Sequence, residues 1–276
     1  MDPPILTGNR DADLLILKRL DDKALFNFCI SDPKNKYVNY ICNNSNFWRN
    51  RLFSKYPNFK LDNITTNINW KKLYLQSVYY LEKYTLDQAL EEASKGGMKN
   101  WNLISLIISQ RAKNWNNGLY GAAEGGHKDL IDFFITKGAD DWNWGMEGAA
   151  FGGHKDLVNF FIFKGAHWWN NAINGAAEGG YKDLVDFFIS KGAKSWNLGM
   201  EGAAKGGHKD LVDFFISKGA NSWNNGMKEA ARGGYKDLVD FFIEKGANDW
   251  DWGMRNAAQG GHLNIVKFFI EKGANL

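Results

Sequence analysis

The stretch from Gly206 to Ala220, GGHKDLVDFFISKGA, combines residue types that often carry chemistry. Paired glycines can cradle an anion, a histidine can bind a metal ion, and a neighbouring lysine and aspartate can transfer protons. Each of these activities needs one constellation of side chains. A single copy of the stretch would be compatible with such a site, whereas many equivalent copies would favour a structural role.

The stretch recurs with a fixed period of 27 residues. The first glycine of the pair is Gly125, Gly152, Gly179, Gly206, Gly233 or Gly260. A seventh, degenerate copy with two additional residues starts at Gly96. A period in this range predicts a solenoid, in which each unit buries its apolar face only against its neighbours. Because six equivalent copies argue against a catalytic site, we expect no enzyme, no catalytic residue and no cofactor.

Tyrosine replaces the histidine of the stretch in two of the six repeats. Its position holds His127, His154, His208, His262, Tyr181 and Tyr235. Tyrosine is a poor substitute for a zinc-binding histidine, and one side chain per repeat cannot assemble a tetrahedral site. We therefore expect no metal site, and rings that pack and hydrogen-bond in a turn between helices. The glycine pairs lack the phosphate-loop pattern and are interpreted as helix terminators, and the Lys-Asp pairs as a solvated helix start.

One unit, residues 143–169, has the pattern of two short helices separated by the glycine pair. Asn143 is predicted to cap the first helix, and Met146 and Ala149 belong to its apolar stripe. The second helix, Lys155 to about Lys164, is apolar nearly all round, which predicts that neighbouring repeats enclose it. The cap position in the other repeats holds Asp87, Asn116, Asn170, Asn197, Asn224 and Asp251.

Residues 85–276 resemble ankyrin repeats. The resemblance rests on the Ala-Ala pair, the Gly-His turn, the LV..FFI helix and the closing Lys-Gly-Ala. It implies an all-α, ankyrin-like solenoid of helix-turn-helix repeats that binds a target protein. The ankyrin unit has about 33 residues, and the present unit is shorter where that family places a β-hairpin finger. We expect seven repeats, the first degenerate, with shortened or absent fingers.

A tryptophan precedes each predicted cap. The six are Trp115, Trp142, Trp169, Trp196, Trp223 and Trp250. They could form a binding stripe, since tryptophan is common in interface hot spots, or a structural spine that joins the repeats by aromatic packing. Their uniformity favours the spine. Close approach of an indole would also explain the glycines inside the first helices, which are Gly121, Gly148, Gly175 and Gly202.

The first 84 residues form a different region. We predict short helices over Ala12–Leu20, Lys23–Ser31, Tyr37–Cys42 and Phe47–Tyr56 within a domain of residues 1–60. Residues 61–84 then provide a polar connector and a bridging amphipathic helix over Trp70–Tyr84. So few helices bury little apolar surface by themselves. We therefore predict that the region packs against a partner or against the repeats.

This region resembles an F-box. The matching residues are Leu14–Leu17, Leu20–Leu25, Cys29–Ile30, Tyr37, Ile41–Cys42 and Phe47–Leu52. F-boxes recruit a target-reading protein to a cullin–RING ubiquitin ligase. The resemblance implies that a ligase adaptor contacts Leu14, Leu17, Leu20, Leu25 and Trp48.

The F-box pattern is incomplete in this chain. The usual Leu-Pro opening and the central tryptophan of the family are absent, and Pro33 interrupts the middle. The alternative is a helical cap over the first repeat, which a solenoid needs in any case. The combination of an F-box-like region with ankyrin-type repeats is also similar to proteins encoded by large DNA viruses of protists, which would make it a host-facing effector.

Composition argues against several classes of protein. Residues 1–84 carry 13 Lys and Arg against 8 Asp and Glu, and residues 85–276 carry 21 against 23. Neither part has the dense basic stripe of a nucleic-acid-binding protein, no apolar run approaches the roughly 20 residues of a membrane span, and we find no secretory signal. Cys29 and Cys42 make no disulfide framework, which favours a reduced cytosolic or nuclear protein. We expect a monomer.

Positions that vary between repeats are not fixed by stacking and are available to a target. Two of them lie four residues apart on one face of the first helix. They are acidic in the early repeats and basic in the late ones, which suits a target with basic groups over repeats two to four and acidic groups over six and seven. The candidate residues are Tyr120, Glu124, Trp144, Glu147, Phe151, Trp168, Lys205, Lys228, Arg232 and Arg255. The alternative is that these are ordinary solvated positions.

Overall fold

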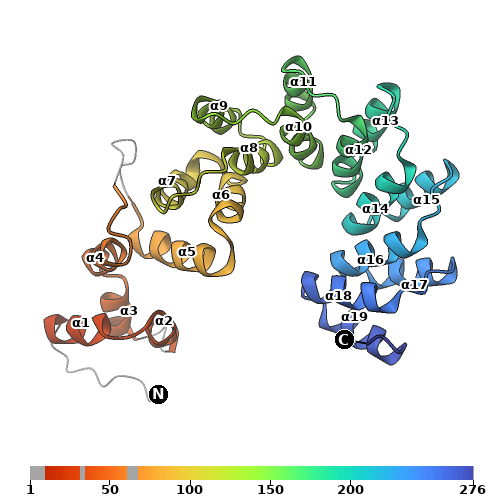
Figure 1. Ribbon diagram of the computed structural model, residues 1–276. Coiled ribbons are helices and arrows are strands. Elements are labelled where there is room, and N and C mark those ends of the chain that lie inside the picture. Colours follow the sequence, from red (N-terminus) through yellow and green to blue (C-terminus); the bar gives the residue numbers. More distant parts are fainter. Residues whose placement is uncertain (1–9, 32–34, 61–67, 276) are drawn as a thin grey trace. The chain divides into compact units, whose positions relative to one another are not determined.

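The computed structural model describes residues 10–31, 35–60 and 68–275. Every regular element in these ranges is a helix, which confirms the predicted all-helical class (Figure 1). Pro33 and most of the polar connector lie outside the described residues. The chain divides into two compact units, Met1–Leu90 with Lys99–Lys113, and Glu91–Met98 with Asn114–Leu276. The division passes through the first repeat rather than through residue 85, where the sequence places the start of the solenoid.

The N-terminal unit begins with four short helices close to the predicted bounds. Its helices are α1 (Arg10–Lys18), α2 (Asp22–Ser31), α3 (Lys36–Cys42), α4 (Ser45–Lys55), α5 (Trp70–Lys83), the first part of α6 (Leu86–Ser94) and α7 (Trp101–Ser109). A short 3-10 helix, Gly97–Asn100, precedes α7. Helix α5 packs against both α4 and α7. Side chains buried in this unit include Leu17, Leu25, Ile41, Trp48 and Leu52.

Asparagine and aspartate side chains fix the starts of these helices. The side-chain oxygens of Asn35, Asn44 and Asn69 accept backbone N–H groups at the beginnings of α3, α4 and α5. Asp21 accepts the N–H of Ala24 at 2.7 Å at the start of α2. Such caps satisfy N–H groups that have no partner inside the helix. The many asparagines of this region therefore serve in part to begin short helices.

A disulfide bond joins Cys29 of α2 to Cys42 of α3. The prediction that the two cysteines form no disulfide is therefore wrong, and the reduced compartment inferred from it loses its basis. The two residues are 13 positions apart in the sequence, and packing of α2 against α3 brings their Cα atoms to 5.7 Å. The bond cross-links two short helices in a unit with a small core, where covalent links are most useful.

The second unit is a solenoid of paired helices. The first helices of the repeats are α8 (Trp115–Glu124), α10 (Trp142–Phe151), α12 (Trp169–Glu178), α14 (Trp196–Gly206), α16 (Trp223–Gly233) and α18 (Trp250–Gly260). The second helices are α9 (Lys128–Lys137), α11 (Lys155–Phe163), α13 (Lys182–Ser190), α15 (Lys209–Ser217), α17 (Lys236–Glu244) and α19 (Leu263–Glu271). Short connections without strands join successive repeats across this range, which agrees with the expected loss of the fingers. The stack of repeats in this second unit is curved, and its first helices lie on the inner side of that curve (Figure 1).

Small residues let the first helices approach one another closely. Ala203 and Ala204 of α14 are fully buried, and a Cβ atom added to Gly202 would lie 2.4 Å from the carbonyl oxygen of Asn174 in α12. Gly148 and Gly175 face equivalent carbonyls at 2.7 Å. The close neighbour of these glycines is therefore the backbone of the preceding helix. The expectation that an indole approaches them is wrong.

Asn143 links two repeats instead of capping its own helix. It is the second residue of α10, and the cap is Asp141. Asn143 Oδ1 accepts the backbone N–H groups of His167 at 2.8 Å and Trp168 at 3.0 Å in the next connection. The same pair of bonds is made by Asn116, Asn170, Asn197 and Asn224, and Asp251 accepts one. The predicted capping role is wrong, and the residue type is explained by contact between repeats.

Each of the second helices α9 to α19 places one phenylalanine in the core of the stack. One from each second helix is fully buried, namely Phe134, Phe161, Phe188, Phe215, Phe242 and Phe269. The six predicted spine tryptophans are the first residues of the first helices and are half-buried. Two of them contact the core. The ring centroids of Trp169 and Phe188 are 6.5 Å apart, and those of Trp250 and Phe269 are 6.4 Å apart. The tryptophans therefore lie at the edge of the core, whereas the phenylalanines are buried inside it.

Candidate functional site

The Gly-Gly-His turn joins neighbouring repeats. His208 Nε2 hydrogen-bonds to the carbonyl oxygen of Glu178 in the preceding repeat at 3.0 Å, and His127 and His154 make equivalent bonds. Gly207 has a φ of 80°, which favours glycine, and the ring of Tyr235 lies directly against it. The expectation that these rings pack and hydrogen-bond in the turn is confirmed for the three histidines. Packing between repeats accounts for the residue types that first suggested chemistry.

The lysine at the start of each second helix also reaches the next repeat. Lys209 pairs with Asp213 at 2.5 Å, and its ammonium group lies 4.0 Å from the ring centroid of Phe241. Equivalent ion pairs and ring contacts are made by Lys128, Lys182 and Lys236. A cation over an aromatic ring is attracted by the negative face of the ring. These lysines therefore contact the next repeat, in addition to lying at the solvated start of each second helix.

The candidate site is the surface of the first helices that faces away from the core. On α10, Trp144, Glu147 and Phe151 share one face because they are three and four residues apart. Gly145 and Met146 lie on the opposite, buried side. We name the equivalent surface of α8, α10, α12, α14, α16 and α18 the first-helix face. It holds nine of the ten predicted target-binding residues, namely all except Trp168.

Side chains on the first-helix face meet in a regular register. The position of Glu147 in one repeat meets the position of Trp144 in the next. The observed pairs are Glu91 Oε2 with Asn117 Nδ2 (2.9 Å), the rings of Tyr120 and Trp144 (5.1 Å), Asn174 Nδ2 with the carbonyl oxygen of Leu198 (2.8 Å), Glu201 Oε1 with Asn225 Nδ2 (2.6 Å), and Lys228 Nζ with the ring of Trp252 (5.6 Å). The sequence showed which positions vary but did not show this pairing.

Aromatic side chains gather in the early repeats of the first-helix face. The half-buried rings of Tyr120 and Trp144 contact each other, and Phe151 lies two turns along α10 from Trp144. Burial raises the pKa of Tyr120, and the carboxylate of Glu124 adds to the effect. Trp168 lies elsewhere, at the N-cap of α12, and is 53% exposed.

Charged residues on this face change sign along the stack. Glu124 pairs with Lys95 at 3.0 Å, and Glu178 pairs with Lys205 at 2.7 Å at the crossover. Further along, the ammonium group of Lys228 lies 4.0 Å from the carboxylate of Glu229 and 5.6 Å from the ring centroid of Trp252. Arg232 and Arg255 are exposed and have no ion pair within the described part of the chain. The basic end therefore keeps free charge, while two of the acidic side chains are neutralised by lysines.

Glu147 has an unusual environment for a carboxylate on a surface. Its burial, together with the nearby negative charge of Glu178, raises its pKa to about 7, although Lys205 partly opposes the shift. The ordinary pKa of glutamate is near 4.3. Near neutral pH a substantial fraction of Glu147 is therefore protonated.

Three of the five predicted ligase-contacting residues lie in the core of the N-terminal unit. Leu17, Leu25 and Trp48 are at most 1% exposed, and Trp48 Nε1 donates to the carbonyl oxygen of Cys42 at 2.7 Å. They cannot contact a partner without unfolding, so the expectation of direct contact by these three is wrong. Leu14 and Leu20 are half-buried. Among its described residues the unit exposes the large apolar side chains of Leu15, Phe26, Ile30, Tyr40 and Tyr79, and of these only Leu15 and Ile30 belong to the predicted F-box pattern.

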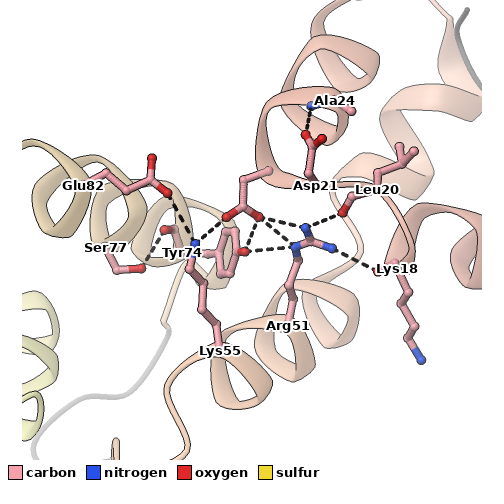
Figure 2. Close-up of polar contacts among 10 residues, drawn as sticks. Lys18, Leu20, Asp21, Ala24, Arg51, Lys55, Tyr74, Ser77 and Glu82 are labelled. Atoms are coloured by element: carbon pink, nitrogen blue, oxygen red, sulfur yellow. Dashed lines mark hydrogen bonds and ion pairs between the residues drawn. The ribbon is translucent and has the colours of Figure 1, made fainter. Parts of the chain in front are cut away.

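A polar cluster around Asp22 joins three helices of the N-terminal unit (Figure 2). The carboxylate of Asp22 accepts hydrogen bonds from Arg51 at 2.8 Å, from Lys55 at 2.5 Å and from the Tyr74 hydroxyl. Partial burial would raise the pKa of Asp22, but these hydrogen bonds outweigh it and lower the pKa to about 2. Arg51 also donates to the carbonyl oxygen of Leu20 at 2.7 Å. Lys55 also pairs with Glu82 of α5 at 3.6 Å, so two carboxylates balance the two cations. Although a cavity of about 610 Å³ adjoins the cluster, we therefore interpret the cluster as a structural link between α2, α4 and α5.

No family model matches this chain, and no curated protein matches it. Among the described residues, none of the helices combines the length and apolar character needed to cross a lipid bilayer. The case for a function therefore rests on the geometry of the two units.

Proposed function

We propose that this chain is a non-enzymatic adaptor for protein–protein interaction, and that its ankyrin-like solenoid binds a target protein on the first-helix face. The observation that carries the proposal is the contact of Tyr120 with Trp144, beside Phe151 and Glu147. Large aromatic residues at half-buried positions are typical of interface hot spots. Other repeats hold asparagine, leucine, glutamate or lysine at many of these positions, so stacking of the repeats does not require the aromatic rings.

The double substitution Trp144→Ala with Phe151→Ala is expected to weaken target binding at least tenfold. Alanine removes two large aromatic side chains of the early repeats, where a partner would find its apolar contacts on this face. Peptides selected on the full-length protein from a random display library serve as probes, and their affinities are measured by fluorescence anisotropy. The chain should remain folded, because the core phenylalanines are untouched.

Trp252→Ala is the matched control for this experiment. Trp252 occupies the same position as Trp144, in the last repeat, and should leave the affinities unchanged. Normal binding to the Trp144 and Phe151 double variant would move the docking surface elsewhere. Phe163 would then become the first alternative, since it is 88% exposed at the end of α11.

The second part of the proposal is that the N-terminal unit recruits a cullin–RING ligase adaptor. The supporting observation is the exposed Leu15 on α1, which lines a cavity of about 310 Å³ together with Leu14 and with Phe47 of α4. An exposed leucine beside a partly apolar cavity suits docking of another helix. The alternative, a unit that only caps the solenoid, needs no such exposed side chain.

Leu15→Glu in the full-length protein is expected to weaken binding of a purified ligase adaptor at least tenfold. The new charge would have to be buried at the interface without a partner. Binding is measured by surface plasmon resonance, with Phe163→Glu as a control that changes an exposed apolar residue of the solenoid. If the unaltered protein shows no binding at micromolar adaptor concentration, the capping interpretation replaces this one.

A further inference from the structure

The pairing between repeats on the first-helix face has one exception. Glu91, Tyr120, Asn174, Glu201 and Lys228 each contact the next repeat. Glu147 occupies the same position, and within the described part of the chain its carboxylate has no hydrogen bond and no ion pair. Its neighbour in the register is Asn171, which is exposed. The structure therefore leaves the carboxylate of Glu147 without a partner in the described part of the chain, between positions that each contact the next repeat.

The charged and titratable groups around Glu147 do not satisfy it. Glu178 of α12 and Asp141 before α10 are both acidic and raise its pKa, as does burial, which has the largest effect. Lys205 of α14 is the one cation that acts on it, and the ammonium group of Lys205 is engaged by Glu178 at 2.7 Å. Tyr120 of α8 completes the surroundings and contributes a neutral hydroxyl. The local field therefore favours an added positive charge.

We infer that Glu147 is the docking point for a basic side chain, lysine or arginine, from the target segment that binds the first-helix face. The inference rests on the proposed function and names the chemistry of the partner. A cation placed there would satisfy the carboxylate and relieve its repulsion from Glu178. It would also lie near aromatic rings on the same helix face, at Trp144 and Phe151.

The chain itself shows that its surface accepts cations in this manner. Lys228 lies 5.6 Å from the Trp252 ring in the same register of later repeats. A cation between a carboxylate and an aromatic face gains from both contacts once water is excluded. A neutral or acidic segment would instead leave the carboxylate of Glu147 buried and unpaired, which is costly.

Binding should depend on pH through Glu147. A basic side chain stays protonated between pH 6 and 8, whereas a carboxyl group with a pKa of about 7 must lose its proton before it pairs. Binding is therefore expected to be tighter at pH 8 than at pH 6, by up to about tenfold.

The test uses peptides selected on the full-length protein at pH 8 from a random library. They are resynthesised without histidine and with an acetylated N-terminus, so that the protein alone titrates. Peptides that depend on Trp144 and Phe151 should contain lysine or arginine in most sequences. Glu147→Gln should weaken them about tenfold and remove the pH dependence. Glu201→Gln is the matched control, because Glu201 holds the same position but is already bonded to Asn225.

Asn171→Lys is a second variant, which keeps the carboxylate but offers it an ammonium group from the next repeat. It should weaken the same peptides, because the docking point is then occupied from within the chain. Peptides that need Trp144 and Phe151 but lack basic residues, or that bind Glu147→Gln equally well, would overturn this inference and leave the proposed function intact. If no selected peptide depends on Trp144 and Phe151, both fail.

Discussion

Gly206→Ala is expected to destabilise the solenoid by about 3 kcal/mol, at the upper end of the range for overpacked sites. A Cβ atom at this position would lie 2.0 Å from the carbonyl oxygen of Glu178 in the preceding repeat. That oxygen belongs to backbone and is held by His208 at 3.0 Å, so it cannot move aside as a flexible side chain would. Because the two helices must separate, the contact between repeats is lost. Urea unfolding of the full-length chain, followed by circular dichroism, measures the change.

Gly219→Ala is the matched control, because it isolates the conformational cost of losing a glycine. Gly219 has a φ of 108°, and no atom lies within 4 Å of an added Cβ. Alanine there suffers only backbone strain, about 1–2 kcal/mol. Gly206 does not have a positive φ. The loss of stability in Gly206→Ala would therefore come from the contact with Glu178 alone. Equal effects of the two substitutions would show that the repeats do not touch at Gly206.

The regular part of the fold follows from the sequence because the period fixes it. Gly152 and Gly153 end one helix, and the apolar stretch after them has the length of the next. The predicted helix from Lys155 to about Lys164 is observed as Lys155–Phe163. A feature repeated six times leaves little freedom in its interpretation. The expected absence of fingers rests on the same argument, since a unit of 27 residues has no chain left to form a hairpin.

The roles of individual residues were harder to predict, because their partners lie in other repeats. Asparagine is a good helix cap, and the neighbours of Asn143 in the sequence predict that role for it. Its actual partners are 24 and 25 residues away. Gly202 was explained by an indole for the same reason, although a carbonyl group is the close neighbour. Local patterns do not reveal which part of the next repeat comes into contact.

The N-terminal unit has no repetition, so its details were least accessible. Amphipathic spacing predicted its helices but not which residues of a helix are exposed. Leu17 and Leu25 were expected to contact a partner and are buried, whereas Leu15 is 58% exposed. The disulfide was missed because composition says nothing about which helices pack together.

Variation between the repeats predicts part of the candidate site. Comparison of the repeats shows where side chains vary, and the structure brings those positions together on the first-helix face. It could not show that Glu147 lacks a partner, because pairing depends on the offset between neighbouring helices. That offset is set by the close backbone contacts at Gly148 and Gly175.

Phe215→Ala should destabilise the solenoid by about 3–5 kcal/mol, more than Trp196→Ala in the same repeat. The Phe215 ring is fully buried, and an added Cβ on Gly199 of α14 would lie only 2.4 Å from it, so truncation leaves a cavity that rigid backbone cannot fill. Trp196 is half-buried at the first residue of α14, and its loss should cost about 1–2 kcal/mol in apolar contact. Urea unfolding of both variants in the full-length chain measures the difference. A larger effect for Trp196→Ala would mean that the tryptophans, and not the phenylalanines, hold the repeats together.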